Sequence, residues 1–107
     1  MTVVLEKVQR LERYVQFING DVDQVLESTI DKVLGREQQR LFRQQARLKS
    51  QIADFEICYG WTSEEFYPRF ERGELGDDTD FIEWSATIEM IENLQHTIDL
   101  LSEKTIE

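Results

Sequence analysis

The stretch YGWTSEEFYPRFERGELGDDTDFIEW, from Tyr59 to Trp84, differs in composition from the sequence on either side of it. It contains seven of the chain's eleven aromatic residues, its only proline and three of its five glycines. Glycine and proline mark turns, whereas the flanking segments have the periodicity of helices. The sequence therefore predicts that this stretch is the tip of a helical hairpin.

Local signals inside the stretch predict a short helix at residues 63–72. Thr62 and Glu65 have the spacing of a capping box, in which each side chain accepts a hydrogen bond from the backbone amide of the other residue. Trp61 and Phe66 have the spacing of the hydrophobic staple that accompanies such a box. Both signals predict the same first residue for this helix.

Glycine and proline residues limit and interrupt the short helix. Gly60 follows a long helical segment, where a left-handed residue closes the last turn without steric strain, and Gly73 ends the short helix. Pro68 stands at the sixth helical position, where it removes an amide donor and clashes with the preceding turn. We therefore expect the helix to be kinked at Pro68 or broken there into two turns.

Three longer helices are predicted from apolar residues spaced alternately by three and four. They cover residues 3–18, 21–59 and 78–104 of what we expect to be one all-α domain, residues 1–107. Gly20 is a natural stop for the first helix and Asp21 a natural cap for the second, so a turn or a kink is expected there. Only Gly35 argues against a continuous second helix. The apolar positions of the first seam are Val4, Val8, Leu11, Val15, Ile18, Val22 and Val25.

If the connection folds back, helices 21–59 and 78–104 run antiparallel as a long hairpin or coiled coil, because a short connection favours antiparallel neighbours. The pairs expected to face each other are Phe55 with Trp84, Leu48 with Ile91, and Leu41 with Ile98. A hairpin of this kind buries little surface per residue. We therefore expect a homodimer or a higher oligomer.

All of the net charge of −10 lies in the second half of the chain. Residues 1–60 contain nine basic and nine acidic side chains, whereas residues 61–107 contain three basic and thirteen acidic ones. An acidic surface repels nucleic acid and attracts basic proteins. The acidic half therefore indicates either a basic partner protein or a surface that only keeps the protein soluble.

The helix predicted at residues 21–59 has a basic ridge on one face and polar residues in its apolar seam. Gln38 and Gln45 fall on the seam, where polar residues weaken a coiled coil but fix its register. The ridge consists of Arg36, Arg40, Arg43 and Arg47. With no interleaved aromatic residues and no recognition-helix motif, a solvated face is favoured over nucleic-acid binding. Contact with an acidic face of another chain is a third interpretation.

The sequence does not indicate a metal or catalytic site. The acids of GDDTD, at residues 76–80, do not match a calcium loop, whose glycine and final glutamate are missing at the required positions. Capping of the last helix by Asp77 or Asp78 explains these acids instead. His96 has no second ligand at metal-binding spacing, and Cys58 ends a helix, where a thiolate is not activated. We therefore predict a non-enzymatic protein with no cofactor.

Cysteine usage and hydropathy indicate a location. A single cysteine cannot form an internal disulfide, which fits the reducing cytoplasm. The sequence shows neither a signal peptide nor an apolar run long enough for a membrane span. We therefore expect a cytoplasmic protein.

The stretch also resembles a recurring block of small helical prokaryotic proteins, in which a long charged helix ends in a KYG-like turn that is followed by SxEEFxxxFexGELGDDxDFxEW and a final helix. The matching residues are Tyr59, Gly60, Ser63, Glu64, Glu65, Phe66, Phe70, Gly73, Glu74, Leu75, Gly76, Asp77, Asp78, Asp80, Phe81, Glu83 and Trp84. Proteins with this block are similar to antitoxin-like partners of small toxins in type II toxin–antitoxin pairs. Pro68 and Trp61 depart from the residues usual at their positions.

The resemblance implies sequestration, in which the acidic second half docks on a basic toxin and covers its substrate surface. The residues expected to make the contact are the aromatic Trp61, Phe66, Tyr67 and Phe70 and the acidic Glu74, Asp77, Asp78 and Asp80. Aromatic residues are chosen because they dominate interface energetics. For Phe66 and Phe70, packing in the core of the tip is the competing interpretation. Two other functions remain open, a self-associating coiled-coil scaffold and RNA binding through the arginine ridge.

Overall fold

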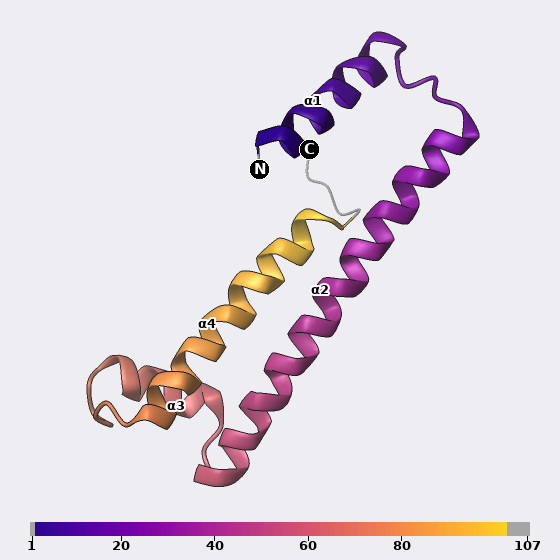
Figure 1. Cartoon of the computed structure of the whole chain (residues 1–107). Helices are drawn as coiled ribbons and strands as arrows, with labels where there is room; N and C mark the ends of the chain where they lie inside the picture. Colours follow the sequence, from indigo (N-terminus) through magenta and orange to yellow (C-terminus); the bar gives the residue numbers. More distant parts are fainter. Residues whose placement is uncertain (1, 103–107) are drawn as a thin grey trace. The chain divides into compact units, whose positions relative to one another are not determined.

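The computed structural model describes residues 2–102, which form four helices and no strand. These are α1 (Thr2–Phe17), α2 (Gln24–Tyr59), α3 (Ser63–Glu71) and α4 (Thr79–Leu100) (Figure 1). The all-α prediction is confirmed. The last helix ends at Leu100, and its predicted end at Lys104 lies outside the described residues.

The chain divides into two compact units, Met1–Gly35 and Arg36–Glu107. The first contains α1, a turn and the beginning of α2. The second contains the rest of α2, together with α3 and α4. Gly35 lies inside α2, which is continuous through it, so this glycine does not end the helix.

A turn at residues 18–23 separates α1 from α2. Asn19 and Gly20 have φ angles of 58° and 76°, in the left-handed region that ends a helix. The cap of α2 is Asp23, whose Oδ1 accepts a hydrogen bond from the amide of Leu26 at 2.8 Å. The prediction that Asp21 caps this helix is therefore wrong. Asp21 belongs to the turn, where its amide donates to the carbonyl of Ile18 at 3.1 Å.

In the second unit, α2 and α4 run antiparallel side by side, and α3 packs against α4 at the tip (Figure 1). Their shared core consists of Leu41, Leu48, Leu94 and Ile98, with Ile91 and Leu101 packed against it. Nearer the tip, the rings of Phe55 and Trp84 stack with centroids 5.6 Å apart. The hairpin prediction is confirmed, because the three pairs predicted to face each other all fall in these two apolar clusters.

Two glutamines bridge the long helices of the hairpin. The buried Gln45 donates from Nε2 to Oε1 of Gln95 on α4 at 3.0 Å. The side chain of Gln38 donates to the backbone carbonyl of Leu101 at 2.6 Å. Each bond exists only in one alignment of the two helices, so both polar seam positions help to set the register of the hairpin.

The local signals of α3 are present in the structure as predicted. The amide of Glu65 donates to Oγ1 of Thr62, and the amide of Thr62 donates to Oε1 of Glu65, both at 3.1 Å. The staple rings of Trp61 and Phe66 stack with centroids 6.5 Å apart. The helix runs unbroken through Pro68, so the expectation of two separate turns is wrong. The carbonyl that loses its amide partner belongs to Glu64, an exposed residue, so water can satisfy it.

Candidate functional site

The hairpin tip is built around Trp84 and Phe66. Their rings are parallel, with centroids 3.9 Å apart, and their exposed fractions are 0% and 1%. The indole Nε1 of Trp84 donates to Oγ of Ser63 at 2.9 Å, so the one polar atom of this ring is satisfied. Because Phe66 is fully buried, it offers no surface to a partner in this conformation. The core interpretation of Phe66 is therefore favoured.

Three of the four predicted aromatic anchors keep part of their surface. Trp61, Tyr67 and Phe70 are half-buried. The guanidinium carbon of Arg69 lies 5.6 Å from the centroid of the Trp61 ring, a cation–π distance. Phe70 stacks on Phe66 with centroids 5.5 Å apart. The tip thus has partly exposed aromatic rings next to charged groups such as the Arg69 guanidinium, and these rings pack on the buried core.

Two tyrosines of the tip donate hydrogen bonds to carboxylates of α4. The hydroxyl of Tyr59 donates to Oδ2 of Asp80 at 2.6 Å, and that of Tyr67 donates to Oε2 of Glu89 at 2.7 Å. Each bond holds the hydroxyl proton against a negative charge and, with partial desolvation, raises the pKa of both Tyr59 and Tyr67 to about 12. Asp80, a predicted contact residue, therefore already has a partner within the chain.

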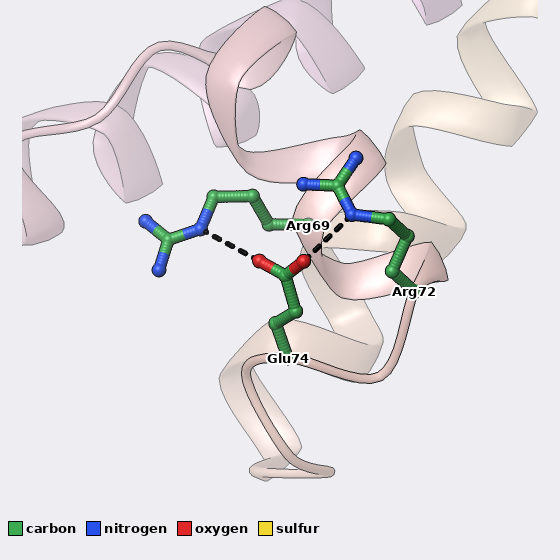
Figure 2. Close-up of polar contacts among 3 residues, drawn as sticks. All are labelled: Arg69, Arg72 and Glu74. Carbon is green, nitrogen blue, oxygen red and sulfur yellow. Dashed lines mark hydrogen bonds and ion pairs between the residues drawn. The ribbon is translucent and has the colours of Figure 1, made fainter.

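Glu74 is also engaged within the tip (Figure 2). Its Oε2 lies 2.7 Å from Nε of Arg72, and its Oε1 lies 3.4 Å from Nε of Arg69. The hydrogen bond from Arg72, supported by Arg69, lowers the pKa of the Glu74 carboxyl. All three side chains remain partly exposed. Glu74 is therefore a contact residue only if a partner competes with these two arginines.

The other predicted acids of the tip have different roles. Asp78 caps α4, since its Oδ1 accepts a hydrogen bond from the amide of Asp80 at 3.1 Å. Asp77 is exposed. Among residues 2–102, the only carboxylates in ion pairs are those of Glu37 and Glu74. The exposed acids of the second half that lack an ion pair within this range include Glu64, Glu71, Asp77, Glu83 and Glu92.

An open groove of about 280 Å³ lies between α3 and α4. It is lined by Ser63, Glu64, Tyr67, Pro68, Ile88 and Glu92. Glu64 and Glu92 give it two carboxylates, while Tyr67, Pro68 and Ile88 give it apolar surface. Sequence reasoning missed Glu92, which lies 28 positions from Glu64 and reaches the groove only because α3 folds against α4.

A second open groove, of about 420 Å³, lies between α2 and α4. Its lining residues are Gln51, Asp54, Phe55, Glu83, Ala86, Thr87 and Met90. Asp54 and Glu83 are again acids without an ion pair within residues 2–102. Negative charge therefore borders both grooves near the tip.

The arginine ridge lies on an exposed face of α2. Arg40 pairs with Glu37 one turn earlier, with 3.0 Å between Nη2 and Oε1. Arg36, Arg43 and Arg47 are exposed. These positions fit the solvated-face interpretation, and they leave contact with RNA or with an acidic chain open.

Neither a cluster of metal-ligand side chains nor a helix suited to cross a membrane is found in the described part of the chain. In residues 2–102, no group of three or more histidine, cysteine, aspartate or glutamate side chains could hold a metal ion. His96 and Cys58 are both exposed. Over the same range, no helix combines the length and the apolar composition that crossing a membrane requires.

Comparison with protein-family models, with curated proteins and with solved structures found no match. The resemblance of the stretch Tyr59–Trp84 to antitoxin-like proteins therefore depends on its own residues. The function that it implies is a proposal.

Proposed function

We propose that this chain is a non-enzymatic protein-binding module, antitoxin-like, that neutralises a small basic toxin by direct binding. The observation that best supports the proposal is the unbalanced acidic surface around the hairpin tip. Exposed acids there, among them Glu64, Glu71, Asp77, Glu83 and Glu92, form no ion pair within residues 2–102. Two of them, Glu64 and Glu92, border the groove between α3 and α4. The proposal assigns the protein to the cytoplasm and gives it no cofactor.

The groove between α3 and α4 has the chemistry to receive an arginine or lysine side chain. The aliphatic stem would pack on Tyr67 and Pro68, and the cation would lie near the carboxylates of Glu64 and Glu92. Charge-assisted hydrogen bonds of this kind are stronger than neutral ones. The half-buried Trp61 would add the aromatic contact that interfaces favour.

The net negative charge of the second half would act before contact as well. A surface of one sign raises the rate at which an oppositely charged protein arrives, and it disfavours partners of the same sign. A toxin that acts on nucleic acid needs a basic surface for the phosphates of its substrate. An acidic protein bound to that surface would exclude the substrate, which is neutralisation by sequestration.

The proposal is tested by pull-down of the full chain with the product of the adjacent gene, followed by mass measurement for stoichiometry. We expect a stable complex that weakens as the salt concentration rises, and growth rescue when both genes are expressed together. If no encoded neighbour binds, the proposal is wrong.

Paired charge variants test whether the groove is the contact surface. Glu64→Gln with Glu92→Gln should weaken the complex by about tenfold or more, because two charge-assisted bonds are lost. Glu6→Gln with Asp31→Asn removes the same charge from exposed positions of the other unit and should change binding little. Equal effects of the two pairs would show that only net charge matters.

A second candidate function is a self-associating coiled-coil scaffold with no toxin partner. It is favoured by the exposed apolar side chains of α1, among them Val4 and Val8. Light scattering of the free protein distinguishes the two candidates when it is combined with the pull-down. A scaffold would form large or regular oligomers without a partner, whereas an antitoxin-like protein would keep one small mass, that of a monomer or a dimer, until its partner is added.

A further inference from the structure

One face of α1 carries an apolar stripe that is exposed to solvent. The exposed fractions of Val4, Val8 and Leu11 are 64%, 56% and 37%. Val15, further along the same stripe, and Ile18, directly after the end of the helix, are half-buried. A continuous row of large aliphatic side chains in contact with water is a feature of helices that associate. The stripe is therefore a surface suited to a partner helix.

The residue types along the stripe follow a heptad pattern. Val8 and Val15 occupy the a positions, and Val4, Leu11 and Ile18 occupy the d positions. In the central layers of α1, β-branched Val8 and Val15 at a flank Leu11 at d, a combination that favours two strands over higher oligomers. The direction of the two helices is decided by the charges beside the stripe.

We infer that α1 pairs with α1 of a second copy of this chain as a parallel, in-register, two-stranded coiled coil. The inference does not depend on the proposed binding of a basic toxin, because it concerns the first unit of the chain and that binding concerns the second.

The charges beside the stripe favour the same arrangement. Lys7 is at a g position and Glu12 is at the next e position, five residues further on. In a parallel, in-register pair, a g residue of one helix faces the following e residue of the other, so Lys7 meets the partner's Glu12 on both sides of the interface. These two symmetric contacts bring opposite charges together.

An antiparallel pair lacks this complementarity. In that arrangement g positions flank g positions and e positions flank e positions. Lys7 would then lie near the partner's Tyr14, and Glu12 near the partner's Leu5. No opposite charges would meet, and two charged groups would lie against apolar side chains. The charge pattern therefore favours the parallel pair.

The first experiment measures dimer dissociation of the full chain by sedimentation over a wide range of concentrations. Lys7→Glu and Glu12→Lys, each alone, should raise the dissociation constant on the order of tenfold, since two attractive pairs become repulsive. Lys7→Glu combined with Glu12→Lys restores opposite charges and should return the constant close to that of the unchanged chain. Failure of the combined variant to recover would overturn the pairing.

Two further variants separate the interface from general effects of charge and folding. Arg13→Glu makes the same change in net charge as Lys7→Glu but lies at an outward f position, so it should leave dimerisation unchanged. Leu11→Asp places a charge in the apolar stripe and should abolish the dimer, while the α2–α4 hairpin, followed by tryptophan fluorescence, stays folded. A monomer at all concentrations, or a dimer that survives Leu11→Asp, contradicts the inference.

Disulfide trapping decides the direction of the helices. In a Cys58→Ser background, Val8→Cys alone and Leu11→Cys alone should each form a covalent dimer, because each parallel layer pairs a residue with its own copy. Arg13→Cys, on the outer face, should form none under the same conditions. Cross-linking seen only when Val8→Cys and Leu11→Cys chains are mixed would show an antiparallel pair and overturn the inference.

Discussion

Replacement of Trp84 should be among the most destabilising single changes in the chain. Its side chain is fully buried, its ring stacks on Phe66 at 3.9 Å, and its Nε1 donates to Ser63. Trp84→Ala removes this packing and leaves a cavity, for which we expect a loss of about 3–5 kcal/mol in the free energy of unfolding. Loss of the ring stack accounts for about 0.5–1.5 kcal/mol of that total. Against a typical domain stability of about 5–15 kcal/mol, the loss is a large fraction.

A graded variant keeps this prediction testable if Trp84→Ala does not fold. Trp84→Phe retains a ring in the stack but loses the hydrogen bond to Ser63 and part of the side-chain volume, so we expect a loss of about 1–2 kcal/mol. Ile57→Ala is the matched control on α2, because Ile57 is 81% exposed and its replacement should change stability by no more than about 0.5 kcal/mol.

The assay is urea unfolding of the full chain, followed by circular dichroism and by the fluorescence of Trp61. The ring of Trp61 lies 6.4 Å from that of Trp84 and therefore reports on the tip in every variant. The reasoning is refuted if Trp84→Ala loses less than about 1 kcal/mol, or no more than Ile57→Ala does. Either result would mean that the aromatic cluster does not hold the hairpin tip together.

Three further changes test single hydrogen bonds. Asp80→Asn should lower the pKa of Tyr59 from about 12 towards 10.0, as measured by NMR titration of the ring. Because the raised pKa of Tyr59 favours the protonated hydroxyl in the folded state, the hydrogen bond contributes stability below about pH 10. This stability is lost as the pH rises towards 12. An unchanged titration of Tyr59 in Asp80→Asn would contradict the assignment of Asp80 as its partner. Asp23→Ala should lower the free energy of unfolding by about 1 kcal/mol, while Asp21→Ala should have little effect. If thermal unfolding shows a larger loss for Asp21→Ala than for Asp23→Ala, Asp21 is the cap of α2 after all. Thr62→Ala should also lower the free energy of unfolding by about 1 kcal/mol. Unchanged protection of the first amides of α3 in hydrogen exchange would count against the capping box.

Signals that involve neighbours in sequence could be predicted well. The capping box at Thr62 and Glu65 needs only residues three positions apart, and Gly60, with a φ of 73°, needs only its own backbone. The cap of α2 is the one signal between neighbouring residues that was predicted wrongly. Asp21 and Asp23 are both good caps, and the choice of Asp23 depends on how many residues the turn after Gly20 uses.

Local rules predict a kink at Pro68 or a break into two turns, because a proline removes one amide bond and strains the preceding turn. The helix is not broken there. In the structure, Phe66 stacks on Trp84 of α4 with centroids 3.9 Å apart, and the hydroxyl of Tyr67 donates to Glu89 of α4. These tertiary contacts, together with the stack of Phe70 on Phe66 across the proline, hold the short helix intact where its own sequence argues against it.

The sequence by itself determined the helices, the caps of α3 and α4, the apolar seams and the concentration of negative charge in the second half. Each of these follows from residue type and from the repeat of the helix, so no distant residue needs to be known. Only the tertiary structure decided what the acids of the tip contact. Asp80 and Glu89 each meet a tyrosine, and Glu64 and Glu92 border one groove without an ion pair in the described residues. These residues are more than twenty positions apart in sequence and come together only when the hairpin folds back. That packing sets the distance between two side chains, and the distance determines the strength of any bond between them.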